Sequence, residues 1–365
     1  MLIVIDTTET FQQPLLAGPD WSYVQSLLNR DVARLVVPEI VIAETINHFP
    51  AKVTEGLSET RRAIGRLKKI VPDVDLFPPE LDVADATARY TDTLRARLNE
   101  LRALMPEYKQ LPIDRIVKRS LQHRKPFDAN GHRGLRDAVF WETVLELART
   151  YKPEPIVVIT GNTNDFGPHE GLATDLMDDL GALGIDSGRI KICDGLSKFI
   201  ESHVKPTLDK LDDLQIQIQE QTTERFDVVD FYAAAYNEIR VAVEDHVRHW
   251  NFQELDYIIR RFFESPKLLD LAASPDVWDV SEVYRTDADE IAFSIVFTLK
   301  GEIECDEIHD HDPMERPWTT EFVGEATFSV ETSQVMEEST GQITEFTLES
   351  VKIIPGSRWP YDDVD

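Results

Sequence analysis

The sequence has 365 residues, more than a single hydrophobic core usually holds, so we expect two or three domains. It contains no apolar run of about 18 residues that would span a bilayer, and its start, MLIVIDTTE, lacks the basic region of a signal peptide. These features predict a cytoplasmic protein with no membrane partner. The two cysteines, Cys193 and Cys305, lie far apart in sequence without a pairing pattern, so the sequence suggests neither a disulfide framework nor a cysteine zinc site.

The formal charge of −29 is unevenly distributed along the chain. Up to Pro206 there are 26 basic and 30 acidic residues, whereas the remainder has 12 basic and 37 acidic residues. Within Arg89 to Arg136 the sign reverses, with 12 basic residues against five acidic ones. This segment is either a path for a phosphate backbone or a set of solvated helix faces, and both interpretations remain open.

Strands alternate with helices over the first half of the chain. The apolar runs that predict strands are Leu2–Ile5, Arg34–Val37, Ile156–Ile159 and Arg189–Cys193. The spacing predicts helices at Trp21–Asn29, from Pro38 onward, and at Thr54–Ile70, Asp82–Met105, Ile113–His123, Leu135–Ala148 and Ala173–Leu183. This alternation indicates an α/β fold in which helices sandwich a parallel sheet, with a helical insertion at about residues 52–125.

The pattern changes after Pro206, which we interpret as a domain boundary closing residues 1–206. Residues 207–270 are expected to be a helical connecting region whose aromatic and aliphatic stripe, including Phe226, Tyr232 and Ile239, packs in a core. From Glu282 the hydrophobic period becomes two, as in antiparallel strands, so residues 271–365 are expected to form an acidic antiparallel β domain.

Carboxylates follow the strands where a parallel sheet places its ligands. Asp6 follows the first strand, Glu44 lies in the helix after the second, Asp137 opens a later helix, and Asp165 follows the strand at Ile156–Ile159. Each alone has an ordinary explanation as a loop, surface or capping residue. Together at one sheet edge they would repel one another unless a cation neutralised them, and Mg²⁺ or Mn²⁺ prefers such oxygen ligands.

The segment TGNTNDF, Thr160 to Phe166, places small polar side chains after a buried strand. With VIDTTE at Asp6, VIAETINHF at Glu44 and GLRDAVFWE at Asp137, it resembles the motif set of PIN-like nuclease domains. The resemblance covers Met1 to about Pro206. Because the insertion before Asp137 is longer than in compact toxin-type PIN domains, the chain is most similar to the larger bacterial PIN-like proteins that carry a C-terminal extension.

The resemblance implies a metal-dependent nuclease, an endoribonuclease before a DNA-directed enzyme, that hydrolyses phosphodiester bonds with Mg²⁺ or Mn²⁺. It assigns Asp6, Asp137 and Asp165 as metal ligands and Glu44 as a ligand or orienting group. Side chains expected to hold these acids by hydrogen bonds are Thr7, Thr160 and Asn162. Candidates for contact with the nucleic acid, RNA favoured over DNA, are Arg124, Lys125, Arg133 and Arg136.

Other interpretations stay open. A haloacid-dehalogenase-like phosphatase needs a second aspartate where this chain has Thr8, which disfavours that class. A catalytically silent PIN-like scaffold that binds partners is a further alternative. The run IHDHDP, ending at Pro313, is either a metal site or an acidic hairpin loop. The acidic region from Thr207 to Asp365 either contacts the basic segment or a protein partner, or is a solubilising surface.

Overall fold

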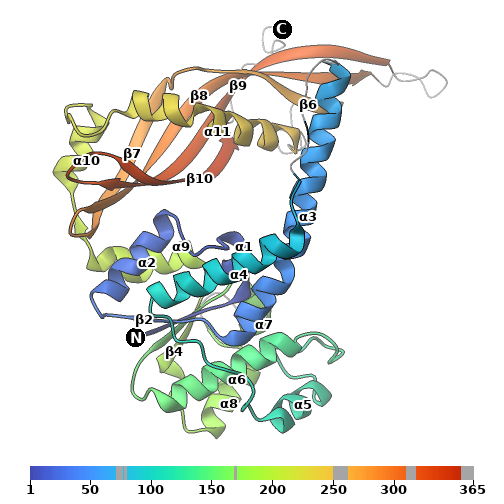
Figure 1. Ribbon diagram of the computed structural model, residues 1–365, viewed down its shortest axis with the longest axis vertical. Helices are drawn as coiled ribbons and strands as arrows, with labels where there is room; N and C mark the ends of the chain where they lie inside the picture. The colour runs from blue at the N-terminus through green and yellow to red at the C-terminus, as the bar shows by residue number, and fades with distance from the viewer. Residues whose placement is uncertain (71–76, 78–79, 168–170, 250–261, 310–317, 355–365) are drawn as a thin grey trace, which may run out of the picture. The chain divides into compact units, whose positions relative to one another are not determined.

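The computed structural model describes residues 1–70, 77, 80–167, 171–249, 262–309 and 318–354 (Figure 1). The chain divides into two compact units, Met1–Thr207 and Leu208–Asp365. Each unit has its own sheet. Within the described residues, no helix is both long and apolar enough to cross a membrane. Most of the run IHDHDP falls in residues 310–317, so that candidate metal site lies outside the described residues.

The first unit is built on a parallel sheet of four strands in the order β2-β1-β3-β4. The strands are β1 (Leu2–Ile5), β2 (Arg34–Val36), β3 (Ile156–Ile159) and β4 (Ile190–Cys193). Every residue of β1 and β3 is buried, as expected for central strands covered by helices on both faces. The structure therefore confirms the predicted α/β class with a parallel sheet between helices.

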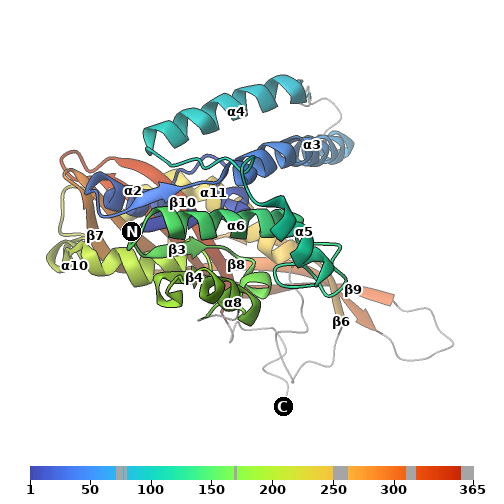
Figure 2. The ribbon, with the colours of Figure 1, turned by 90° about the horizontal axis from the view of Figure 1, so that it is seen from below.

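Helices and short helical turns surround this sheet. They are α1 (Thr7–Gln12), α2 (Pro19–Asn29), α3 (Glu39–Ile70), α4 (Val83–Glu100), α5 (Ile113–Leu121), α6 (Leu135–Thr150), α7 (Thr163–Phe166), α8 (Thr174–Ala182) and α9 (Leu196–Phe199), with turns η1 (Ser187–Arg189), η2 (Ile200–Val204) and η3 (Lys205–Thr207). Ala138, Trp141 and Val144, which recur at helical spacing along α6, are fully buried. Figure 2 shows the long α3 running beside α4.

Two helix boundaries differ from the prediction. The helix expected from Pro38 and the one expected at Thr54–Ile70 form the single helix α3, which continues through Pro50. Proline removes one backbone hydrogen-bond donor, but the helical turns before and after Pro50 keep the helix continuous. The helix expected to reach Met105 ends at Glu100, because Leu104 joins the sheet edge: its N–H donates to the Leu35 carbonyl over 2.8 Å.

The second unit is an antiparallel sheet covered by a long helix. Its helices are α10 (Asp212–Gln219) and α11 (Val228–Arg248), and its strands are β5 (Asp209–Lys210), β6 (Phe262–Leu271), β7 (Val277–Asp287), β8 (Glu290–His309), β9 (Trp318–Glu337) and β10 (Ile343–Ile353). The sheet order is β10-β9-β8-β7-β5, with β6 paired to β8. Phe226, Tyr232 and Ile239 are buried in a core shared with alternate residues of β8. The predicted antiparallel architecture of this region is confirmed.

Candidate active site at the carboxyl edge of the parallel sheet

The sheet order places a crevice between β1 and β3. In the sheet order, β1 connects to its neighbour β2 in one direction, and β3 connects to its neighbour β4 in the other. The connections therefore leave β1 and β3 in opposite directions. At such a switch point the loops beyond the strand ends separate and leave room for a ligand. Asp6 follows β1 and Thr160 follows β3 at this point. The Asp6 N–H donates to the Ile159 carbonyl over 3.0 Å, which fixes the turn leaving β1.

Asp6 is a buried carboxylate held by hydroxyl groups. Only 6% of the surface of Asp6 is exposed to solvent. Thr160 Oγ1 donates to Asp6 Oδ2 over 2.6 Å, and Thr8 Oγ1 donates to the same oxygen over 3.3 Å. Burial raises the pKa of Asp6, while these hydrogen bonds oppose the rise by favouring the ionised form. A negative charge on the buried Asp6 is therefore stabilised by the hydrogen bonds from Thr160 and Thr8.

Asp137 interacts with two of the other acids. It lies in the first turn of α6, which begins after Gly134. Burial is the main cause that raises the pKa of Asp137 to about 6, and the negative charges of Asp6 and Asp165 add to the rise. The structure thus brings Asp6, Asp137 and Asp165 near enough for mutual repulsion, although they come from three separate parts of the chain.

Asp165 and Glu44 each contact a neutral hydrogen-bond donor and a basic side chain, and Glu44 has a histidine nearby as well. Asn162 Nδ2 donates to Asp165 Oδ2 over 3.0 Å, and Lys125 Nζ lies 3.0 Å from Asp165 Oδ1. Glu44 accepts a hydrogen bond of 2.9 Å from Thr7 Oγ1 and forms an ion pair with Arg136, and His48 Nε2 lies 3.7 Å from its Oε1. Each of the predicted supporting residues Thr7, Thr160 and Asn162 therefore contacts a carboxylate.

The donor set fits a hard divalent cation in chemistry. The three carboxylates repel one another, and Mg²⁺ or Mn²⁺ would neutralise that charge. Hydroxyl and amide oxygens, which such ions also accept as ligands, lie nearby. In the part of the chain that the structure describes, no three His, Cys, Asp or Glu side chains are arranged around one point as metal ligands. Lys125 and Arg136 instead balance Asp165 and Glu44. Asp137 has no ion pair with a described basic residue.

The predicted nucleic-acid contacts have different surroundings. Arg124 lies within 3.5 to 3.6 Å of three carboxylates at the start and middle of α8, namely Asp175, Asp178 and Asp179. Lys125 and Arg136 contact the acids of the site itself. Arg133 is exposed, and its backbone N–H donates to Asp128 Oδ1 over 3.1 Å. Of these four basic side chains, only that of Arg133 has no acidic partner among the described residues.

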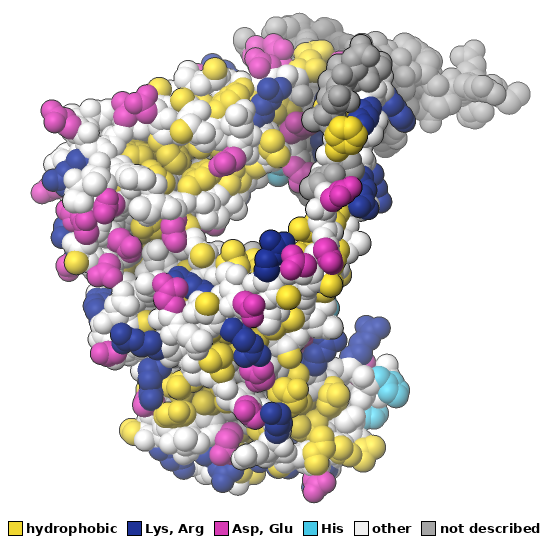
Figure 3. Space-filling model, in the orientation of Figure 1, with side chains coloured by type: hydrophobic (Ala, Val, Ile, Leu, Met, Phe, Trp, Pro, Cys, Tyr) yellow, Lys and Arg dark blue, Asp and Glu magenta, His cyan; other side chains and the backbone are white. Residues whose placement is uncertain are grey.

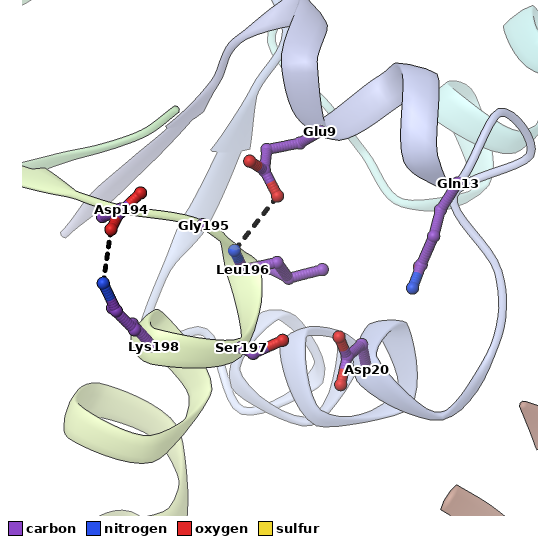
Figure 4. Close-up of a pocket in the computed structure, with 8 residues that line it drawn as sticks. All are labelled: Glu9, Gln13, Asp20, Asp194, Gly195, Leu196, Ser197 and Lys198. Atoms are coloured by element: carbon purple, nitrogen blue, oxygen red, sulfur yellow. Dashed lines mark hydrogen bonds and ion pairs between the residues drawn. The ribbon is translucent and has the colours of Figure 1, made fainter. Parts of the chain in front are cut away.

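Glu9 is a buried acid near the site that the sequence did not point to. It is 4% exposed, and its Oε2 accepts a 3.0 Å hydrogen bond from the Leu196 N–H. Figure 4 shows Glu9 beside a pocket of about 270 Å³ that Asp194 and Lys198 also line as an ion pair. Burial raises the pKa of Glu9, and the charges of Asp6 and Asp194 contribute. Its position one helical turn after Asp6 is the only signal the sequence offered.

Comparison with protein families agrees with this fold. Residues 3–166 match a family model described as PIN domain. The matched segment spans β1 to α7, the elements that carry Asp6, Glu44, Asp137 and Asp165. The match supports a PIN-like nuclease domain family for the first unit. Neither the curated proteins nor the solved structures gave a significant match to the chain.

Proposed function

We propose that the first unit is a divalent-metal-dependent nuclease that hydrolyses phosphodiester bonds, with RNA as its substrate. The observation that supports this most is the position of Asp137, whose pKa is raised to about 6 by burial and by the charges of Asp6 and Asp165. Repelling carboxylates at a switch point of a parallel sheet are costly unless they serve a cation. The PIN-like family of the unit supplies the reaction class.

In this proposal Asp6, Asp137 and Asp165 hold Mg²⁺ or Mn²⁺, and Glu44 holds or orients it. When bound, such an ion lowers the pKa of a water molecule and stabilises negative charge on the phosphate. The roles of the supporting side chains follow from their contacts. Thr160 donates a hydrogen bond to Asp6, Asn162 donates one to Asp165, and Thr7 donates one to Glu44, so that each of these side chains orients one carboxylate.

Basic side chains are assigned a second role in this proposal. Lys125 and Arg136 neutralise Asp165 and Glu44 in the metal-free protein. Once a cation balances those carboxylates, the two basic groups are available to the phosphates of the substrate, together with the exposed Arg133. Arg124 is a weaker candidate for this contact, because its acidic partners on α8 are not balanced by the cation. The substrate would therefore approach the carboxylates from the side of residues 124–136. We propose a cytoplasmic location, where RNA is accessible.

One observation favours a second candidate, a silent scaffold that binds nucleic acid or protein without cleaving it. The ion pairs of Lys125 with Asp165 and of Arg136 with Glu44 balance two of the four acids without any metal. In a scaffold these pairs would be permanent and structural. The nuclease proposal instead requires that a divalent ion displaces them, so that the two candidates differ in metal binding as well as in activity.

The experiment that separates them uses the full chain with labelled single-stranded RNA and DNA in Mg²⁺, Mn²⁺ or EDTA. The nuclease proposal predicts RNA cleavage with Mg²⁺ or Mn²⁺, none in EDTA, and slower cleavage of DNA. Calorimetric titration with Mn²⁺ supplies a second measurement that does not depend on finding the right RNA. A protein that neither binds Mn²⁺ nor cleaves either substrate would support the scaffold.

A further inference from the structure

The basic segment Arg89–Arg136 uses much of its charge inside the first unit. Several of its arginines form ion pairs with acids on neighbouring elements: Arg95 with Glu39, Arg115 with Glu142, Arg119 with Asp179, Arg124 with Asp175 and Arg136 with Glu44. Charges already paired in this way add less to the attraction of a distant polyanion. The net positive balance of this segment therefore overstates the positive charge it presents to a ligand.

A second group of basic residues lies at the far end of α3. Residues 61–70 contain five basic and no acidic residues. The basic residues, all exposed, are Arg61, Arg62, Arg66, Lys68 and Lys69. Within the described part of the chain none of them has an acidic partner, and Lys68 Nζ lies 5.0 Å from the ring centre of Phe77. Figure 3 shows dark blue side chains along the segment labelled α3 in Figure 1.

Helix geometry gathers the five residues on one face. At about 100° per residue they fall within an arc of about 160°, with Gly65 inside the arc and Ala63, Ile64 and Leu67 outside it. From Arg61 to Lys69 the face extends about 12 Å along the axis. Phosphates of one strand in a duplex are about 3.4 Å apart along the axis, so this length spans three to four of them.

We propose that this face, defined here as the α3 basic face (Arg61, Arg62, Arg66, Lys68 and Lys69), is a docking site for the phosphate backbone of the nucleic acid. Glu44 lies on the same helix, and 17 to 25 residues separate it from the face, about 26 to 38 Å of helix. The face therefore holds a part of the strand remote from the carboxylates, about eight to eleven nucleotides away at duplex spacing. Only the identity of the polyanion rests on the proposed nuclease function.

The composition of the face favours a nucleic-acid backbone over other ligands. A helix that lies in a membrane surface needs a large apolar face, and here Leu67, 42% exposed, is the one large hydrophobic side chain that is clearly exposed between residues 61 and 69. Residues 61–70 contain no aromatic side chain on which bases could stack. The face is therefore expected to bind phosphates without reading the base sequence.

The test measures binding rather than cleavage. Fluorescence anisotropy of a labelled 30-nucleotide single-stranded RNA, in EDTA and over a series of salt concentrations, is compared between the full chain and the variant Arg61→Glu/Arg62→Glu. We expect the Kd to rise by about tenfold at low salt, and the slope of log Kd against log salt to fall by about 1.4, because each lost phosphate contact on a single strand removes about 0.7. An RNA of scrambled sequence should give the same result.

Two further variants test whether the position of the charge or its total determines binding. Lys109→Glu/Arg149→Glu changes the net charge equally at exposed positions of the same unit, and it should shift Kd less than about twofold. Lys68→Gln/Lys69→Gln removes charge from the face without adding acids to α3, and it should weaken binding with an unchanged circular dichroism spectrum. Agreement of both variants with these expectations would show that the position of the charge, and not its total, determines affinity.

Several outcomes would overturn the inference. Affinity and salt slope that are unchanged in both α3 variants would do so, as would an equal loss in the charge-matched control. Sedimentation with phosphatidylserine vesicles that depends on these residues, with RNA binding unaffected, would assign the face to a membrane. Failure of the nuclease proposal would look different, because a chain that never cleaves RNA can still show α3-dependent binding in EDTA.

Discussion

Thr160 Oγ1 donates a 2.6 Å hydrogen bond to Asp6 Oδ2 and so joins the ends of β3 and β1 at the switch point of the sheet. The orientation of the hydroxyl is fixed from the other side, because the Asn162 N–H donates to the same Oγ1 over 2.9 Å. Both Asp6 and Thr160 are buried. The hydroxyl therefore supplies a directed donor that a buried carboxylate needs to remain ionised.

Replacing Thr160 by valine keeps the shape of the side chain but removes this donor. We expect the Mn²⁺ affinity of the Thr160→Val variant to fall by roughly ten- to a hundredfold, the usual effect of losing a group that orients a metal ligand. Thr160→Ser should retain most of the affinity, since serine keeps the hydroxyl. Thr143, also buried but bonded to the Val139 carbonyl on α6, supplies the control Thr143→Val, which should bind Mn²⁺ normally. Normal binding by Thr160→Val would refute the role.

Lys125 is expected to compete with a metal ion for Asp165, because its Nζ lies 3.0 Å from Asp165 Oδ1. The Lys125→Gln variant should bind Mn²⁺ roughly fivefold more tightly, which corresponds to about 1 kcal/mol of interaction for a partly exposed charge. Lys125→Arg keeps the charge and should behave like the unchanged protein. Titration calorimetry measures both. Weaker Mn²⁺ binding by Lys125→Gln would mean that the lysine supports the metal site and does not compete with it.

The stability of the metal-free protein should depend on pH through Asp137. Its pKa rises from 3.8 to about 6 on folding, so between these values the folded chain binds more protons at this residue than the unfolded chain does. The contribution of Asp137 is therefore increasingly destabilising as pH rises through this window, and it is constant above it. In EDTA the Asp137→Asn variant should show a Tm advantage that grows from pH 4 to pH 7. A difference that does not change with pH would contradict this.

The parallel sheet could be predicted because its signals are local. Val157 and its neighbours form a continuous apolar run that ends in turn residues, and this pattern is typical of a buried central strand. The same reasoning placed Asp6 and Thr160 at strand ends. It could not have found the path of residues 101–105, because the bond of Leu104 to the Leu35 carbonyl depends on a sheet edge that is distant in sequence.

The electrostatic surroundings of the site could not be predicted, because they depend on contacts between residues far apart in sequence. Lys125 and Asp165 are 40 residues apart, and only the folded chain shows that they form an ion pair. The same is true of Glu9, whose partner, the Leu196 N–H, lies 187 residues away. On α3 the five cations were visible in the sequence, but that they lack acidic partners among the described residues became apparent only from the structure.

The central claim is that the carboxylates at the sheet edge bind a divalent ion and cleave RNA with it. Its most direct test is parallel measurement of Mn²⁺ binding and RNA cleavage for the full chain, Asp6→Asn, Asp137→Asn and the control Asp114→Asn, whose side chain is exposed on α5. We predict that the first two variants lose both properties while their metal-free Tm is unchanged or higher, because each loses a repelling charge. Asp114→Asn should keep both. Unchanged Mn²⁺ binding and turnover in Asp6→Asn or Asp137→Asn would contradict the claim.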